Sequence, residues 1–313
     1  MVMNPLLAAL LMLASHAGEA AGTKKVAITF DDLPVVSSSK ISIDEKREIT
    51  DRILAALTKR KVHAIGFVNE DKIYETGEVD AGIALLQKWL DAGMELGNHT
   101  FGHVGLFKTP VDQYEDAIVK GEVVTRWLLA QRGTQPKYFR HPFLQTGNSA
   151  EDKEHVEKFL ASRGYTVAPV TIENDDYYYA CVDDHLSAQD ASNPRKVQAS
   201  YLRHLGESID TFETMSQELF SRQIPQIFLI HANRLNAATL DQTLNVFERR
   251  GYSFISLDEA LADPVYRIAV APSGRFGPTW LMRWARAQPK ELSVYGQPDP
   301  SGWIVEQHHQ LCE

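Results

Sequence analysis

Short apolar segments alternate with longer amphipathic segments along most of the chain. The apolar segments predict strands over residues 26–30, 62–68, 94–97, 138–140, 165–169, 226–230 and 253–256. Apolar residues spaced three and four apart predict helices over residues 44–60, 79–92, 110–132, 149–162, 195–222 and 237–250, with a short helix from Leu257. Strands that alternate with helices are typical of an α/β fold with a parallel sheet.

Two segments break this alternation. Residues 173–194 are rich in Asp and Tyr and predict a long irregular connection, and such connections usually carry function. The tail from Val265 contains Pro, Gly and an amphipathic stretch over residues 279–287. We expect residues 22–264 to form the main domain and residues 265–313 to form a peripheral C-terminal extension packed on it.

The N-terminus predicts export. An apolar stretch over residues 5–14 is followed by small residues, which indicates a signal peptide over residues 1–21. That stretch is too short to span a bilayer, so no stable membrane insertion is expected. No Lys or Arg precedes it, and an apolar helix docked on the domain or a retained anchor are the alternatives. Export would place the mature protein in the periplasm or outside the cell.

The net charge and the cysteine content restrict the classes of binding partner and the possible states of the two cysteines. The 313 residues carry a formal net charge of −9 and no run of Lys or Arg, which argues against binding to nucleic acid or to an anionic membrane. The two cysteines, Cys181 and Cys312, can form a disulfide in an oxidising compartment or remain as two thiols. The sequence does not predict an oligomeric state.

Polar residues follow the ends of several predicted strands. They are Asp31, Asp32, His99, Arg140 and His231. In parallel α/β barrels the carboxyl ends of the strands form the rim on which active sites are built. A turn-forming Asp pair or a single buried His would mean little alone, but these residues share one predicted rim.

Two histidines and two carboxylates on this rim suit a metal site. His99 and His103 are separated by three residues, and Asp31 and Asp32 are adjacent. Two imidazoles and one carboxylate match the three protein ligands of catalytic zinc. The second carboxylate would then be free to take a proton from water.

Other residues suggest how a substrate is handled. Arg140 can orient a carboxylate, and the backbone near Phe143 can line the pocket. His231 can protonate a leaving group as a general acid. The cluster at residues 175–179, Asp-Asp-Tyr-Tyr-Tyr, suits stacking on sugar rings, although an exposed acidic turn with packing aromatics is the simpler alternative.

These motifs together resemble those of the polysaccharide deacetylases, the NodB homology group or carbohydrate esterase family 4. The resemblance covers about residues 25–262 and rests on Thr29-Phe30-Asp31-Asp32, His99-Thr100-Phe101-Gly102-His103, Arg140-His141-Pro142-Phe143, Asp176-Tyr177 and Leu229-Ile230-His231. It implies a distorted (β/α) barrel with parallel strands. It also implies metal-dependent removal of acetyl groups from N-acetylated sugars.

The resemblance assigns roles around the metal. Asp31 would be the catalytic base, oriented by Arg140. Asp176, or its neighbour Asp175, would hold Arg140. The cofactor would be a divalent ion, usually zinc and sometimes cobalt or another metal, bound by Asp32, His99 and His103.

It also assigns roles around the substrate. His231 would be the general acid, and Leu229 would line the pocket for the acetyl methyl group. The backbone N–H of Phe143 would stabilise the oxyanion. Two positions depart from the family pattern: Phe143 replaces a usual Tyr, and Tyr177 replaces a usual Trp, which affects one wall of the pocket.

Together with the predicted signal peptide, the resemblance predicts a secreted hydrolase of carbon–nitrogen bonds that releases acetate from a peptidoglycan-like or chitin-like glycan. An esterase that removes O-acetyl groups, as from xylan, would need the same machinery. A glycan-binding protein without turnover would be expected to lack the base or a metal ligand, and none is missing. A metal-independent hydrolase on the same fold is disfavoured by intact Asp32, His99 and His103.

Overall fold

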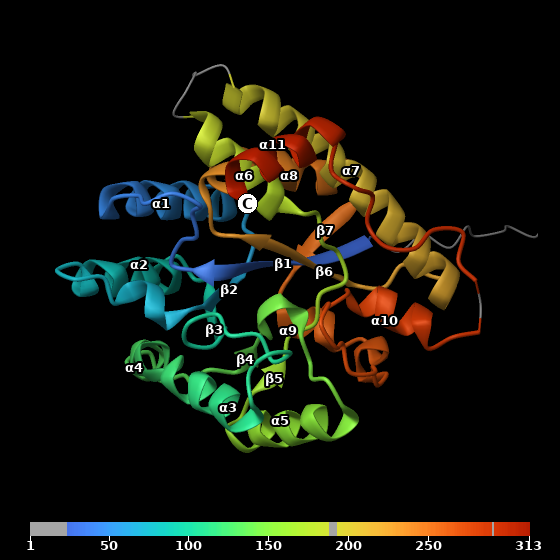
Figure 1. Ribbon diagram of the computed structural model, residues 1–313, viewed down its shortest axis with the longest axis horizontal. Helices are drawn as coiled ribbons and strands as arrows, with labels where there is room; N and C mark the ends of the chain where they lie inside the picture. The colour runs from blue at the N-terminus through green and yellow to red at the C-terminus, as the bar shows by residue number, and fades with distance from the viewer. Residues whose placement is uncertain (1–23, 188–192, 290) are drawn as a thin grey trace, which may run out of the picture.

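The computed structural model describes residues 24–187, 193–289 and 291–313. Its centre is a seven-stranded sheet in which every described pairing is parallel (Figure 1). The strands run in the order β5-β4-β3-β2-β1-β6, with β7 paired to the start of β1. Their bounds are β1 Lys24–Leu33, β2 Ile65–Val68, β3 Glu95–Asn98, β4 Tyr138–Phe139, β5 Thr166–Val167, β6 Gln226–His231 and β7 Tyr252–Ile255.

The sheet curls until the segment after β5 meets β6. Ile172 forms a parallel bridge with Phe228, and Leu229 N donates to Ile172 O at 3.0 Å. Thr171 N adds a bond to Ile227 O at 2.9 Å. This contact closes the ring irregularly, so the predicted distorted (β/α) barrel with parallel strands is confirmed.

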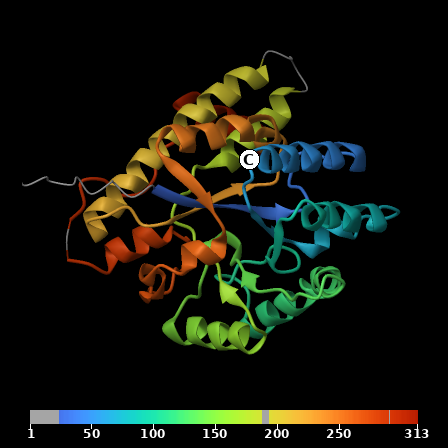
Figure 2. The ribbon, with the colours of Figure 1, turned by 180° about the vertical axis from the view of Figure 1, so that it is seen from behind.

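Helices surround the sheet (Figures 1 and 2). Those of the main domain are α1 Ile43–Lys59, η1 Glu70–Ile73, α2 Val79–Asp91, α3 Val111–Lys120, α4 Val123–Ala130, η2 Pro142–Leu144, α5 Ala150–Ser162, α6 Asp176–Ser187, α7 Asn193–Phe220, α8 Arg234–Arg249, α9 Leu257–Leu261 and η3 Pro264–Arg267. At α1 the predicted capping box is present, with the Ser42 and Glu45 side chains each bonded to the other's backbone N–H. In the described part of the chain, none of the helices has the length and apolarity that crossing a membrane requires.

Strand β1 has two different faces. Val26, Ile28 and Phe30 belong to the large core between sheet and helices. Ala27 instead packs with Phe67 and other side chains in a separate cluster. Because side chains alternate along a strand, Thr29 and Asp31 project from the same face as Ala27.

The predicted helix over residues 110–132 is two helices, α3 and α4. They are separated at Gly121, where a Cβ atom would lie 2.6 Å from the carbonyl carbon of Thr100. The second helix is capped from a distance, because the buried Glu70 carboxylate accepts the N–H groups of Val124 and Thr125 at 2.9 and 2.6 Å. Such a long-range cap has no signature in the local sequence.

The prediction of an irregular connection over residues 173–194 is wrong for much of its length. Residues 176–187 form α6. Tyr179 and Val182 of this helix pack with Tyr201 of α7 and Ile304 near the C-terminus. The helix depends on partners distant in sequence, and its polar, Tyr-rich composition concealed it.

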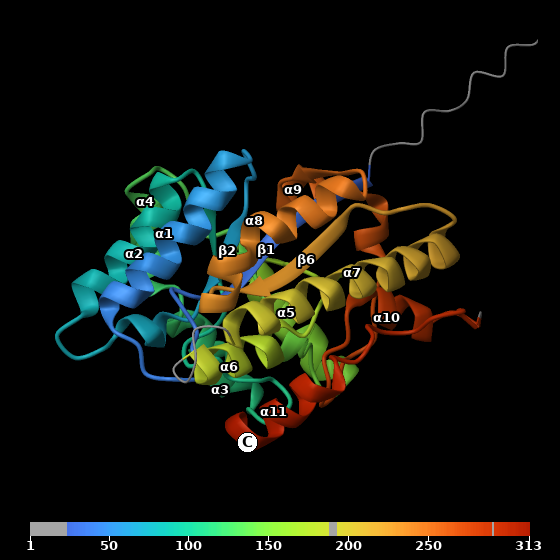
Figure 3. The ribbon, with the colours of Figure 1, turned by 90° about the horizontal axis from the view of Figure 1, so that it is seen from above.

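The C-terminal extension contains α10 (Trp280–Arg286) and α11 (Gly302–Cys312). Helix α10 contacts α7, and α11 lies along α6 (Figure 3). Of the two alternatives for the cysteines, the structure has the disulfide, which joins Cys181 in α6 to Cys312 in α11. The predicted signal peptide lies outside the described residues, and the division of the chain at residue 264 stays a prediction.

Candidate active site

A cavity of about 960 Å³ opens at the carboxyl ends of the strands. Most of the predicted site residues line it, namely Asp31, Asp32, His99, His103, Phe143, Tyr177, Leu229 and His231. The other two, Arg140 and Asp176, are buried and contact residues of that lining. The structure thus brings the predicted residues to one place, and their chemical roles stay predictions.

The two aspartates have different surroundings because the pairing of β1 with β2 is irregular between Phe30 and Leu33. Asp31 is the last residue in register with β6 and lies beside His231. Asp32 adopts a positive φ of 67°, a conformation that Asp tolerates better than most residues. Both side chains are buried, and with this irregularity in the strand both line the same cavity.

Asp32, His99 and His103 form a candidate metal site. Asp32 Oδ1 lies 3.8 Å from His99 Nε2 and 3.6 Å from His103 Nε2, and all three potential ligand atoms lie within 4.8 Å of one another. Donor atoms around one tetrahedral zinc ion are separated by roughly 3–4 Å. Asp32 Oδ1 is buried and accepts no hydrogen bond from the described residues, as expected of an oxygen reserved for a cation. The residues fit a divalent metal.

The protonation states of this cluster also suit a metal. Burial lowers the pKa of His99 and of His103 to about 4, so both imidazoles are neutral near pH 7. His99 Nδ1 lies 2.7 Å from Arg140 O, which fixes the ring with Nε2 towards the cavity. Burial opposes ionisation of Asp32, but Lys72, 3.3 Å from Oδ2, with the nearby histidines holds the pKa of this carboxyl below its usual range.

Arg140 holds Asp31 from inside the barrel. Its Nη1 donates to both carboxylate oxygens, at 3.2 and 3.4 Å, and its Nη2 donates to Thr29 Oγ1 at 3.1 Å. The guanidinium is fully buried and stacks 4.5 Å from the Phe67 ring centroid. Burial raises the pKa of Asp31, and the Arg140 charge opposes that rise. Arg140 therefore both orients this carboxylate and favours its charged form.

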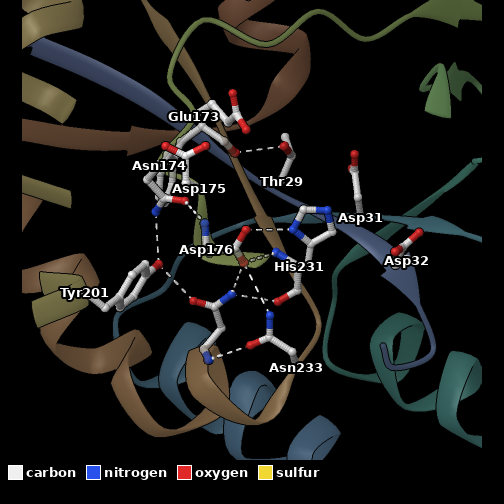
Figure 4. Close-up of polar contacts among 12 residues, drawn as sticks. Thr29, Asp31, Asp32, Glu173, Asn174, Asp175, Asp176, Tyr201, His231 and Asn233 are labelled. Atoms are coloured by element: carbon white, nitrogen blue, oxygen red, sulfur yellow. Dashed lines mark hydrogen bonds and ion pairs between the residues drawn. The ribbon is translucent and has the colours of Figure 1, made fainter. Parts of the chain in front are cut away.

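Asp176 contacts His231 and not Arg140, so the predicted link from Asp176 to Arg140 is wrong. Its Oδ1 lies 2.7 Å from His231 Nδ1, and its Oδ2 accepts the His231 N–H at 2.9 Å (Figure 4). Asn236 Nδ2 donates to the same Oδ2 at 2.5 Å. The alternative residue, Asp175, lies 3.4 Å from His204. Asp176 contacts His231 because it begins α6 next to β6, the strand that ends at His231. Arg140 contacts Asp31 directly.

This pairing controls the charge of His231. Burial opposes protonation, but the Asp176 carboxylate outweighs it and raises the pKa of His231 to about 10. With Nδ1 facing Asp176, the ring directs Nε2 away from that carboxylate. His231 is then protonated at neutral pH, the state that a proton donor requires.

The remaining predicted residues shape the cavity wall. Phe143 and Tyr177 are 57% and 47% exposed although both are aromatic, so they offer ring surface to a ligand. Leu229 is buried in β6, two residues before His231. Phe143 also packs edge-on to His103, with ring centroids 4.5 Å apart.

Sequence reasoning missed several residues that support the site. Thr29 lies within the first motif but was given no role, and Lys72 and Asn236 lie outside every motif. The C-terminal extension was expected to be peripheral, yet Arg275, Phe276 and Gly277 line the cavity. Of these residues, only Thr29 could have been identified from the sequence. It lies two residues before Asp31 on a strand, and residues two apart on a strand project from the same face.

Comparison with known proteins agrees with this geometry. Residues 18–166 match the sequence family described as polysaccharide deacetylase. This match covers just under half of the chain and shows that the segment is similar to a polysaccharide deacetylase domain. That match includes the residues from Asp31 to Phe143, whereas Asp176, Leu229 and His231 lie beyond it.

Curated relatives of the deacetylase domain are distant in sequence. A peptidoglycan-N-acetylglucosamine deacetylase of Bacillus cereus is 26% identical over 153 residues, which is 49% of this chain and 46% of that protein. One of Listeria monocytogenes is 23% identical over 237 residues, 75% of this chain and 38% of that protein. The chain thus spans less than half the length of these relatives.

Solved structures with a similar arrangement are also distant. A family 4 carbohydrate esterase from Streptomyces lividans is 19% identical, with a TM-score of 0.47 over 81% of this chain and 100% of that one. A peptidoglycan deacetylase from Bacillus subtilis is 20% identical, with a TM-score of 0.46 over 77% and 93%. TM-scores below 0.5 transfer no function, and the barrel assignment rests on the strand pairing of this chain.

Proposed function

We propose that this protein is a secreted, metal-dependent deacetylase that hydrolyses N-acetyl groups of an amino-sugar glycan and releases acetate. One observation carries the proposal. Asp31 and His231 are register partners on neighbouring strands and face the same cavity as the Asp32–His99–His103 cluster. A proton acceptor, a proton donor and a cation site therefore meet in one cavity.

Asp32, His99 and His103 would hold the metal, with zinc preferred for a site of two imidazoles and one carboxylate and cobalt or another divalent ion as alternatives. When bound, such an ion polarises a carbonyl oxygen and makes water a better nucleophile. The protein's own residues carry the proton transfers.

Asp31 is the proposed general base. Its carboxylate, held by Arg140, takes a proton as water attacks the acetyl carbonyl. The Phe143 N–H would donate to the oxyanion that develops on the carbonyl oxygen. His231, protonated against Asp176, would then give its proton to the amine nitrogen as the C–N bond breaks.

The substrate class follows from the relatives and from the cavity wall. Both relatives described above are named for peptidoglycan N-acetylglucosamine, and the exposed Phe143 and Tyr177 rings suit stacking on sugars. A peptidoglycan-like or chitin-like N-acetylated glycan is the proposed partner. The predicted leader and the Cys181–Cys312 disulfide support export to an oxidising compartment.

Acetate release from a panel of substrates tests this proposal. The zinc-loaded protein would be given N-acetylglucosamine oligomers, peptidoglycan and O-acetylated xylan. Release from the first or second, with little from xylan, is the expected result. Release from xylan alone would replace the proposal with an O-acetyl esterase. Glycan binding without any acetate release would indicate a binding protein.

A further inference from the structure

The loop after β4 has an unusual backbone. Phe143 and Leu144 both have positive φ values, 54° and 53°, and neither is glycine. Consecutive non-glycine residues in this region are strained, by about 1 kcal/mol or more each, and persist only where surrounding contacts enforce them. This loop carries the N–H that the proposed function assigns to the oxyanion.

Arg283 of the C-terminal extension supplies such contacts. Its Nη2 donates to the carbonyl of Leu144, and its Nη1 donates to Thr146 Oγ1 at 2.8 Å. Its Nε donates to Pro278 O at 2.9 Å, and its guanidinium lies 4.3 Å from the Trp280 ring centroid. The side chain comes from α10 and reaches a loop more than a hundred residues earlier in the chain.

The charge of Arg283 is not neutralised in the usual way. The residue is buried, and all its hydrogen bonds among the described residues go to neutral oxygens. Burying a guanidinium without a carboxylate is unfavourable, and burial lowers its pKa to about 10. A leucine or methionine would pack there without that penalty, so the bonds to the loop are what the guanidinium adds.

The segment before α10 packs against the same loop. Gly277 lies so close that a Cβ atom there would be 1.9 Å from Phe143 O. Thr146 N donates to Ser273 Oγ, and Gln145 Nε2 donates to Arg275 O, both at 2.8 Å. The loop is therefore fixed from one side by residues outside the matched deacetylase segment.

We propose that Arg283, with Gly277 against the loop, is a positioning residue that holds the Phe143 N–H where the oxyanion forms. This inference rests on the proposed function. It assigns the C-terminal extension a part in catalysis, acting through the loop and without contact to the substrate.

The test compares five variants of the full chain, Arg283→Lys among them. Arg283→Met removes the bonds, and Gly277→Ala moves the Phe143 carbonyl while leaving Arg283 in place. Arg286→Met is the matched control on the exposed side of α10. Gly302→Ala is the control glycine, since a Cβ there meets nothing within 4 Å. Hydrogen exchange over residues 143–147, kcat and KM for deacetylation, zinc stoichiometry and Tm are measured for each.

Faster exchange in the loop and a kcat reduced about tenfold or more, with KM and zinc content near wild type, are expected for Arg283→Met and Gly277→Ala. The two controls should match wild type, and Arg283→Lys should recover part of the rate. Unchanged exchange and kcat in folded Arg283→Met and Gly277→Ala would overturn the inference. Altered exchange in a chain whose wild type releases no acetate would instead overturn the proposed function and leave the loop contact established.

Discussion

Asp176 Oδ1 lies 2.7 Å from His231 Nδ1, and the same carboxylate accepts the His231 backbone N–H. The pair links the start of α6 to the end of β6, next to the proposed base. It raises the pKa of His231 to about 10, so the imidazole is protonated near neutral pH. The orientation and charge of the proposed acid and of the proposed base thus depend on different partners. Asp176 acts on His231, and Arg140 acts on Asp31.

Replacing Asp176 should change the alkaline side of the pH profile. A raised pKa keeps His231 protonated below about pH 10, and activity is lost as pH rises through that value. In Asp176→Asn the pKa should fall towards its ordinary value near 6.5. We expect kcat at pH 8 to fall about tenfold or more, with partial recovery at lower pH. Asp175→Asn, next in sequence but paired with His204, should keep the wild-type profile. An unchanged alkaline limb in Asp176→Asn would show that His231 is not the acid.

Substitutions at Asp31 and at Asp32 should distinguish a loss of catalysis from a loss of metal binding. Asp31→Asn keeps the three candidate ligands, so we expect zinc to bind with near-normal stoichiometry while kcat falls by about 10²–10⁴. Asp32→Asn removes a ligand and should lose zinc as well as activity. Zinc content by elemental analysis and acetate release, measured on the same samples, check both. A near-normal rate in Asp31→Asn would exclude it as the base.

Thr29→Val should destabilise the protein without removing any proposed catalytic group. The hydroxyl accepts a hydrogen bond from Arg140 Nη2, and valine would leave that buried N–H unpaired. The expected loss in the free energy of unfolding is about 1–3 kcal/mol. Thr214→Val, which alters a hydroxyl bonded within the surface of α7, serves as the control. Equal denaturation midpoints for the two variants would argue against a structural role for the Thr29 bond.

Tyr177→Ala should weaken binding of long glycans. The ring is 47% exposed at the cavity, and loss of a stacking contact worth about 0.5–1.5 kcal/mol raises KM by a few-fold to about tenfold. A small acetylated substrate that does not reach the ring should be unaffected. Trp127→Ala, the control, changes an aromatic residue that is 56% exposed and absent from the cavity lining. If both variants show the same KM for oligomers, Tyr177 does not contact the sugar.

The sequence predicted the features that depend on nearby residues. Strand ends, the paired aspartates and the His99–His103 spacing are local, and parallel strands bring their carboxyl ends to one rim. The capping box at Ser42 was predicted for the same reason.

Contacts between distant segments could not be predicted in this way. Helix α6 exists because of α7 and α11, and Asp176 is held by Asn236, sixty residues later. The family resemblance placed Asp176 in the site region but attached it to the wrong partner, since its carboxylate contacts His231. Arg283 has no local pattern at all, since its role appears only when the chain returns to the loop at Phe143.

The proposed function depends above all on acetate release that requires a bound metal. The protein would be stripped with a chelator and assayed on N-acetylglucosamine oligomers before and after addition of zinc or cobalt, with Asp32→Asn treated in parallel. We expect no release from stripped wild type, restored release after either metal, and none from Asp32→Asn. Full activity of the stripped protein, or no metal binding by wild type, would contradict the proposed function.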